Sequence, residues 1–358
     1  MSAVRAAALG YQGFGNVGDE AILGGIETLL ADGPIRVETI FTGDRAPIPA
    51  FPDARRVTSR RLLPTPAAAR RLRRARLLIL SGGGLIHDHW PIVIPRYLAW
   101  SLLARALGVR IAWLGVGVGP IEHAWARRAA AATVRLADLV TVRDEASAAW
   151  VRRIAPGARP HIVPDPAFFL PRPEASRGGG LAIIVRQPVP SESHLAPRLV
   201  EAVAGLAGAR MAARRRVTIL TMERGLDDDY AAGIARAVSA GGPVPEVRTI
   251  PIEPGAALRM LAGFDEAVSV RLHGLILCAL AGTPCVPITY DPKVAGTAAR
   301  LGLADLAVPL ADVSTDLVAD RLKRVATGAR RASVEAGVVA LRAEATRVAE
   351  MVASVVRD

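Results

Sequence analysis

The chain has 358 residues, of which 51% are hydrophobic and 22% charged, a composition that fits two globular domains and excludes a disordered protein. Its formal net charge is +12, so we expect either an anionic partner or solvated arginine-rich surfaces. Aromatic residues make up only 4%, and no nucleic-acid-binding motif is present, so we expect no nucleic-acid partner.

Features that would place the chain in or across a membrane are missing from the sequence. No run of about 18 uncharged apolar residues occurs, and the first residues do not resemble a signal peptide. Cys278 and Cys285 lie in apolar segments and are expected to be buried and reduced. These features predict a cytoplasmic protein. The arginine-rich run 70–76 fits either a solvated helix face or a patch for peripheral contact with the anionic inner membrane face.

Apolar, strand-like runs alternate with helical patterns through the first half of the chain. The expected strands lie near residues 4–10, 35–41, 76–80, 110–114, 138–142 and 161–163. The expected helices lie near residues 19–31, 95–107, 122–136 and 144–153. This alternation predicts a parallel sheet covered by helices on both faces.

The pattern restarts after a proline- and glycine-rich segment. Further strands are expected near 181–185, 216–220, 246–249, 265–269 and 285–288, and residues 331–356 form one long amphipathic helix pattern. We therefore predict an N-terminal Rossmann-like domain (1–172), a linker (173–180), a C-terminal Rossmann-like domain (181–330) and a C-terminal helix (331–358). In this α/β fold, with two doubly wound sheets, ligands bind at the carboxyl ends of the strands, in a cleft between the domains.

A glycine-rich loop follows the first expected strand. Residues 13–18 match the dinucleotide fingerprint GxGxxG, but Asp19 and Glu20 come next and would repel a pyrophosphate at the helix start. We expect a loop that contacts another ligand through Gly15 and Asn16. A tight turn before a self-capped helix is the alternative.

Two more glycine runs, at residues 81–84 and 115–119, are expected to follow strands. Gly83, Gly84 and Gly117 would let the backbone approach a ligand, although close packing of loops is an equal alternative. The His87-Asp88-His89 sequence lacks a third nearby ligand for a metal, so we expect no metal and favour substrate contact by His87 or Asp88.

Cations follow the expected strands of the second half. Arg186, Arg271 and Lys293 each lie where a strand ends, and Lys293 is one of only two lysines in the chain. Arginine binds phosphate or carboxylate through two parallel hydrogen bonds, and lysine acts as a point charge. His273 lies two residues after Arg271 at a helix start and is the best acid–base candidate, with a structural role as the alternative.

Seven runs in this order resemble the polysaccharide pyruvyl transferase family, and particularly the bacterial enzymes that pyruvylate cell-wall polysaccharide. The matching runs are YQGFGNVGDEAI (11–22), GGGLIHD (82–88), GVGVGP (115–120), VRDEAS (142–147), PDPA (164–167), RLHG (271–274) and YDPKV (290–294).

The resemblance implies a fold like the GT-B glycosyltransferases, phosphoenolpyruvate as the donor, a sugar as the acceptor and a cyclic pyruvyl ketal as the product. It implies no cofactor beyond phosphoenolpyruvate as co-substrate. In this interpretation His273 donates a proton, Arg271 stabilises the departing phosphate, Asp19 or Asp88 acts as the base and Lys293 holds the donor. An undecaprenyl-linked sugar is one form that the acceptor can take.

Two other functions remain open at this stage. The first is a GT-B glycosyltransferase with a nucleotide-sugar donor, for which Glu253 would have to serve as the ribose clamp. The second is a non-catalytic sugar- or membrane-binding protein, which would leave the cluster of Arg271, His273 and Lys293 without a purpose.

Overall fold

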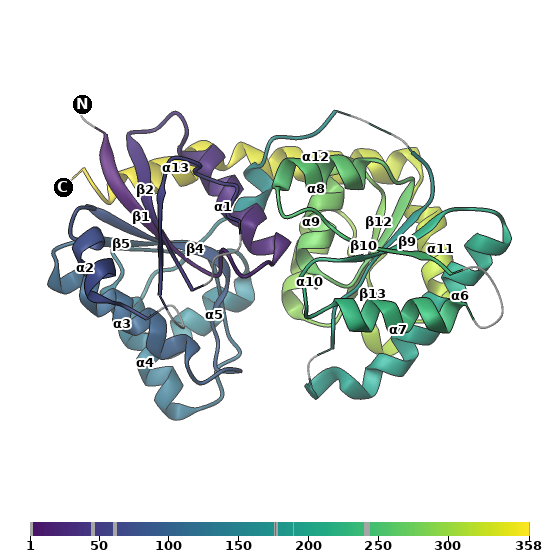
Figure 1. The fold of residues 1–358 in the computed structure, drawn as a ribbon, viewed down its shortest axis with the longest axis horizontal. Helices are drawn as coiled ribbons and strands as arrows, with labels where there is room; N and C mark the ends of the chain where they lie inside the picture. The colour runs from purple at the N-terminus through teal and green to yellow at the C-terminus, as the bar shows by residue number, and fades with distance from the viewer. Residues whose placement is uncertain are drawn as a thin grey trace. The chain divides into compact units, whose positions relative to one another are not determined.

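The computed structural model describes residues 3–43, 47–59, 63–174, 176, 178–188, 190–239 and 244–357. The chain divides into two compact units (Figure 1). Unit 1 comprises Met1–Leu170 and Leu341–Asp358, and unit 2 comprises Pro171–Ala340. Each unit contains a parallel sheet covered by helices, as the alternating pattern predicts.

Unit 1 contains a seven-stranded parallel sheet with the order β3-β2-β1-β4-β5-β6-β7. Its strands are β1 (Val4–Leu9), β2 (Ile35–Thr42), β3 (Arg55–Thr58), β4 (Leu77–Ile86), β5 (Arg110–Val118), β6 (Leu139–Val142) and β7 (His161–Ile162). Its helices include α1 (Val17–Leu30), α2 (Pro66–Leu72), α3 (Val93–Ala106), α4 (Ala124–Leu136) and α5 (Glu145–Ile154).

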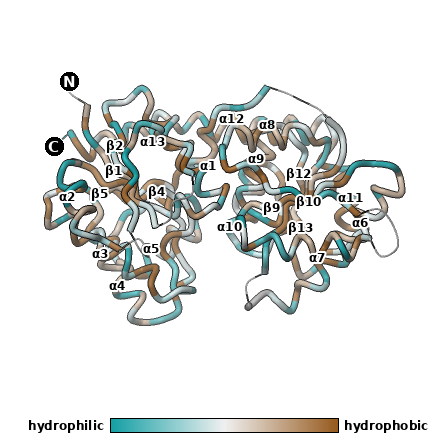
Figure 2. Tube along the Cα trace, viewed as in Figure 1, coloured by the Kyte–Doolittle hydropathy of each residue, from teal (hydrophilic) through white to brown (hydrophobic). Residues whose placement is uncertain are grey.

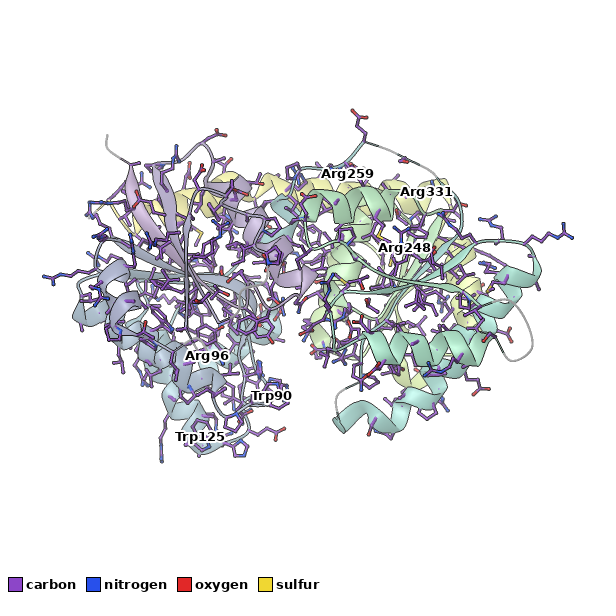
Figure 3. The ribbon with its side chains drawn as sticks, viewed as in Figure 1. Trp90, Arg96, Trp125, Arg248, Arg259 and Arg331 are labelled. Carbon is purple, nitrogen blue, oxygen red and sulfur yellow. The ribbon has the colours of Figure 1, made fainter. Side chains whose placement is uncertain are left out.

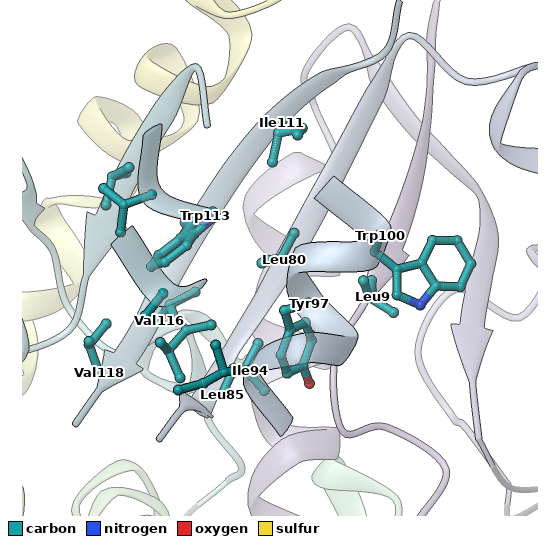
Figure 4. Close-up of a cluster of buried hydrophobic side chains, with 14 of the residues drawn as sticks. Leu9, Leu80, Leu85, Ile94, Tyr97, Trp100, Ile111, Trp113, Val116 and Val118 are labelled. Atoms are coloured by element: carbon teal, nitrogen blue, oxygen red, sulfur yellow. The ribbon is translucent and has the colours of Figure 1, made fainter. Parts of the chain in front are cut away.

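The largest side chains of the core between the unit 1 sheet and helix α3 are aromatic. Tyr97 and Trp100 of α3 are buried together with Trp113 of β5 (Figure 4). Trp100 also packs on Phe41 of β2, with ring centroids 4.3 Å apart. These contacts fix the helix on strands β2, β4 and β5, and so they position the loops at the ends of those strands.

Unit 2 contains a six-stranded parallel sheet with the order β10-β9-β8-β11-β12-β13. Its strands are β8 (Leu181–Ile184), β9 (Val217–Thr221), β10 (Glu246–Thr249), β11 (Glu266–Ser269), β12 (Cys285–Thr289) and β13 (Val308–Pro309). Its helices include α6 (Ala196–Ala212), α7 (Asp228–Val238), α8 (Pro254–Ala262), α9 (Leu272–Ala281), α10 (Pro292–Arg300) and α11 (Thr315–Val325). Hydrophobic residues concentrate along the central strands and α9 (Figure 2). Cys278 and Cys285 are both buried and free, as expected.

The glycine run 81–84 lies within a strand, and the expectation of a loop there is wrong. Strand β4 continues to Ile86, and its register with β5 shifts between Gly83 and Ile86. Gly82 and Gly83 have φ angles of +41° and +79°, which side-chain-bearing residues rarely adopt, so the glycines allow a bulge at the end of the strand. Strand β5 likewise extends through Gly115 and Gly117.

The C-terminal helix is present as α12 (Gly328–Ala343) and α13 (Ala345–Ser354), with Glu344 between them. Val338, Leu341, Val348 and Val352 are buried, as the spacing of apolar residues predicts. Helix α13 packs against α1, so the end of the chain completes unit 1. No helix among the described residues is long and apolar enough to cross a membrane.

Candidate functional site

Unit 2 gathers charged side chains at the carboxyl ends of four adjacent strands. Arg186 follows β8, Glu223 follows β9, Arg271 follows β11, and Tyr290 and Lys293 follow β12. These strands are neighbours in the sheet order β9-β8-β11-β12. Parallel strands end at one edge of the sheet, so the fold brings Arg186, Arg271 and Lys293 to a common region, as the sequence predicts.

The turn that carries Arg271 and His273 is fixed by local hydrogen bonds. The Ser269 hydroxyl donates to the Arg271 carbonyl at 2.8 Å and accepts from the Arg271 N–H at 3.2 Å. Arg271 is the N-cap residue of α9, and His273 lies in its first turn. A Cβ atom at Gly274 would lie 2.3 Å from the Ser269 Oγ, so glycine allows the helix to begin this close to the strand.

Asp227 is the buried hub of this region, and sequence reasoning missed it. Its carboxylate accepts backbone N–H groups from Gln187 at 3.0 Å, Met222 at 3.3 Å and Glu223 at 3.1 Å. It also accepts a hydrogen bond from the Arg271 guanidinium at 2.5 Å. Asp227 is 0% exposed and therefore ties together segments that follow β8, β9 and β11. Its only signal in the sequence is an acidic run after a strand, which also fits a solvated loop.

The charges around Arg271 perturb one another. Burial alone would lower the pKa of Arg271, but the adjacent Asp227 carboxylate and then Glu223 raise it, so the guanidinium stays charged. Burial raises the pKa of Glu223, while Arg271, 3.3 Å away, opposes that shift. Arg186 also lowers the pKa of Glu223, which places its charge in the same region as Arg271.

Tyr290 links the other two cations. The Arg186 guanidinium lies over the Tyr290 ring, 4.0 Å from its centroid, and the Lys293 Nζ is 5.9 Å from the same centroid. Lys293 also pairs with Asp291 at 2.8 Å, and Asp291 caps α10 by accepting the Lys293 N–H at 3.0 Å. Both cations are therefore held in fixed positions beside one aromatic ring.

In unit 1, the first glycine loop leads into α1, and its polar groups are largely used within the loop. Gly15 has a φ of +82°, and Asn16 caps the helix by accepting the Gly18 N–H at 2.9 Å. Asp19 and Glu20 lie in the first turn, as expected. A Cβ atom at Gly83 would lie 2.6 Å from the Asp19 Oδ1, so the Asp19 carboxylate lies directly over the β4 bulge.

Arg143 and Asp165 complete this edge of the unit 1 sheet, and neither was among the predicted site residues. Arg143 follows β6, is buried, and pairs with Asp165 at 3.1 Å. A Cβ atom at Gly117 would lie 3.0 Å from the Arg143 Nη2, and one at Gly84 would lie 4.0 Å from it. Two of the predicted glycines, Gly84 and Gly117, therefore lie near a buried guanidinium, which the runs VRDEAS and PDPA signal only through the family resemblance.

His87 and Asp88 follow strand β4. The His87 and His89 rings are 4.9 Å apart. The Asp88 Oδ2 accepts the N–H groups of Glu122 at 2.7 Å and His123 at 2.8 Å and contacts the His123 Nδ1 at 2.9 Å. Burial would raise the pKa of Asp88, but these interactions with His123 and Glu122 together lower it. Asp88 thus holds the segment before α4 in place. Among the described residues, no three His, Cys, Asp or Glu side chains lie close enough together to hold a metal ion.

Glu20 gives the glycine loop a pH-dependent stability. It is 0% exposed and accepts the Gly13 N–H at 2.7 Å, and burial raises the pKa of Glu20 from 4.5 to about 7. Between these values the folded protein holds a proton that the unfolded chain has lost, so stability falls as the pH rises from about 4.5 to about 7, by about 3 kcal/mol in total.

A Glu20→Gln variant cannot ionise at this position, so its stability relative to the wild type is expected to increase across that window. Urea unfolding at a series of pH values measures this difference. The matched control is Glu38→Gln on β2, an exposed residue whose replacement should leave the pH dependence of stability unchanged. Equal pH dependence in the wild type and the Glu20 variant would contradict the assignment.

Comparison with known proteins agrees with this architecture. The chain resembles a UDP-glucosyltransferase from Polygonum tinctorium, with a TM-score of 0.57 and 11% identity over 99% of both chains. It resembles the UDP-GlcNAc 2-epimerase from Methanocaldococcus jannaschii, with a TM-score of 0.52 and 12% identity over 95% of this chain and 98% of the other. It also resembles S. aureus TarM, with a TM-score of 0.53 and 13% identity, over 79% of this chain but only 55% of TarM.

These identities are low, so the likeness establishes the GT-B-like fold alone. No curated protein matched the sequence. The sequence profile described as polysaccharide pyruvyl transferase matches residues 16–292, which is most of the chain and includes the Arg271 and His273 turn. The chain therefore belongs to the polysaccharide pyruvyl transferase family.

Proposed function

We propose that the protein transfers a pyruvyl group from phosphoenolpyruvate to a sugar of a cell-wall or exopolysaccharide, forming a cyclic ketal and releasing phosphate. The observation that carries the proposal is the group of three cations in unit 2, Arg186, Arg271 and Lys293, beside His273 in a chain of this family.

The donor is an anion with a phosphate and a carboxylate, and binding it requires at least two cationic contacts. Arg186 and Lys293 are suited to this because Tyr290 holds both, at 4.0 Å and 5.9 Å from its ring centroid. A guanidinium binds a carboxylate or phosphate through two hydrogen bonds, whereas Lys293 contributes a point charge. The Arg271 guanidinium stays charged with Asp227 as its main partner, and it is our candidate for the group that stabilises the departing phosphate.

The reaction begins with a proton that His273 donates to the methylene carbon of phosphoenolpyruvate. The carbon that bears the phosphate becomes cationic, and a sugar hydroxyl attacks it and loses its proton to a base. The bond between that carbon and the phosphate oxygen then breaks, and phosphate leaves with the electron pair, so the carbon becomes cationic again. A second sugar hydroxyl attacks this carbon and loses its proton to a base, which closes the ketal ring. Asp19 of unit 1 is our candidate for the base.

Acceptor binding is assigned to unit 1 by the same proposal. Gly15, Asn16, Gly83, Gly84, Gly117 and His87 are the candidate contacts, and Arg143 joins them because it lies against two of these glycines. A lipid-linked sugar precursor at the inner membrane face fits the positive charge of the protein.

A glycosyltransferase that uses a nucleotide sugar is the second candidate, because UDP-sugar enzymes are among the structures with a similar fold. The Glu253 that would clamp a ribose is used as the cap of α8, where it accepts the N–H of Gly255 at 2.8 Å.

The test measures phosphate release from phosphoenolpyruvate with a panel of undecaprenyl-linked and synthetic sugar acceptors, beside binding titrations of phosphoenolpyruvate and UDP. Acceptor-dependent phosphate release is expected. Tight binding of UDP, with neither binding of phosphoenolpyruvate nor phosphate release from it, would indicate that the protein is a glycosyltransferase instead.

Replacing Lys293 tests the donor site more specifically, because the other lysine of the chain, Lys323, serves as a matched control. Lys293→Ala is expected to weaken phosphoenolpyruvate binding by roughly tenfold to a hundredfold, the value of a hydrogen bond to a charged group. Lys323→Ala removes the only other lysine, which is exposed on α11, and should leave binding unchanged. Equal affinities for the two variants would exclude Lys293 from the donor site.

A further inference from the structure

A groove in unit 1 is lined by five arginines from two separate parts of the chain. Arg55 and Arg56 come from β3, the edge strand of the sheet, and Arg70, Arg71 and Arg74 come from helix α2 and the turn after it. The other described lining residues are Val57, Thr58 and Ala67, so no carboxylate from the described part of the chain lines the groove. The arginine-rich run at 70–76 can be recognised in the sequence, but only the folded structure shows that it lies beside the arginines of β3.

Local structure positions helix α2, which with the turn after it carries three of these arginines, and it anchors the Arg56 side chain directly. Thr65 caps α2 by accepting the Ala68 N–H, and Ala68 and Leu72 are the buried residues of the helix. The arginines of α2 therefore lie on the opposite, solvent-facing side. Arg56 is anchored by backbone carbonyls, at 2.9 Å from the oxygens of both Pro52 and Ile48.

Ion pairs within the described part of the protein do not neutralise the charge of this groove, although Arg56 interacts electrostatically with the buried Glu20 carboxylate and lowers its pKa. None of its five arginines forms an ion pair with a carboxylate among the described residues. Some exposed arginines elsewhere have such partners, including two that Figure 3 labels. Arg248 lies 3.6 Å from Glu246, and Arg259 lies 3.5 Å from Glu253. Crowding like charges opposes folding, and a bound external anion would offset that cost.

We propose that this groove docks the protein on an anionic membrane, where its arginines bind the phosphate groups of lipid headgroups. Guanidinium groups bind phosphates through paired hydrogen bonds, and several basic residues close to a surface add their attractions. Leu63, which precedes α2 in the chain, is 37% exposed and is a candidate for apolar contact with the membrane. The inference does not depend on the proposed reaction.

The test is sedimentation of the full chain with vesicles of phosphatidylcholine alone and of phosphatidylcholine with phosphatidylglycerol. Arg70→Glu combined with Arg74→Glu reverses two exposed charges of the groove. The matched control, Arg135→Glu with Arg236→Glu, makes the same change of net charge on α4 and α7, at two exposed positions outside the groove. Circular dichroism confirms that both variants are folded.

The wild type is expected to bind only the anionic vesicles, and less at high salt. Each arginine near a membrane surface contributes roughly fivefold, so the groove variant should bind at least about tenfold more weakly, and the control should retain most of the binding. Equal losses in both variants would show attraction by net charge alone and overturn the proposal. Equal binding to vesicles with and without phosphatidylglycerol would overturn the proposal as well. So would binding to heparin in the absence of binding to either kind of vesicle.

Discussion

Replacing His273 with glutamine is expected to slow acceptor-dependent phosphate release by about 10²–10⁴-fold, the usual contribution of a positioned general acid. Glutamine retains hydrogen-bonding capacity at the start of α9 but cannot deliver a proton to carbon. The cations at the strand ends remain, so phosphoenolpyruvate binding should change little. Steady-state phosphate release and a binding titration on the same preparation separate the two effects.

The control for this prediction is His161→Gln, which changes an exposed histidine on β7 of unit 1 and should leave turnover intact. A His273 variant with normal turnover would remove the histidine from the reaction. A variant that loses both binding and turnover would indicate that His273 shapes the donor site without serving as the acid.

The alternation of apolar runs was enough to predict two parallel sheets, because each buried strand must be a nearly continuous apolar segment. Strand β3 escaped prediction because its sequence, RRVT, has too little apolar character for a buried strand, and the structure places it at an edge of the sheet. The extension of β4 through Gly82–Gly84 escaped for a different reason. Glycine normally interrupts a strand, and only the pairing with β5 shows that the strand continues.

Some residues of the candidate site could be predicted from the sequence, and others could not. Cations that directly follow strands, such as Arg186 and Arg271, could be found from position alone. Asp227 could not, because it lies six residues after the end of β9 within an acidic run, and its complete burial depends on segments far away in the sequence. Arg143 is one of many arginines in the sequence. It differs from most of them because it is buried against Gly117 and Asp165, and no local sequence pattern predicts that burial.

The hub position of Asp227 leads to the largest expected effect on stability. Asp227→Ala would leave the buried Arg271 guanidinium without its main partner and three backbone N–H groups without their acceptor. Breaking a buried ion pair from one side costs about 3–5 kcal/mol, a large part of the stability of a domain. Urea unfolding, followed by a probe in unit 2, measures the loss.

Glu223→Gln is the matched control because it removes the second carboxylate beside the same guanidinium. Its contact with Arg271 is longer, at 3.3 Å, and Arg271 keeps Asp227, so the cost should be about 1 kcal/mol or less. Asp227→Asn keeps an acceptor oxygen but loses the charge, and it should fall between the two. If all three variants cost the same, the region is held together by packing, and the hub assignment is wrong. If their order is as expected, the segments after β8, β9 and β11 are held in register by one carboxylate, and the position of Arg271 in the proposed donor site depends on it.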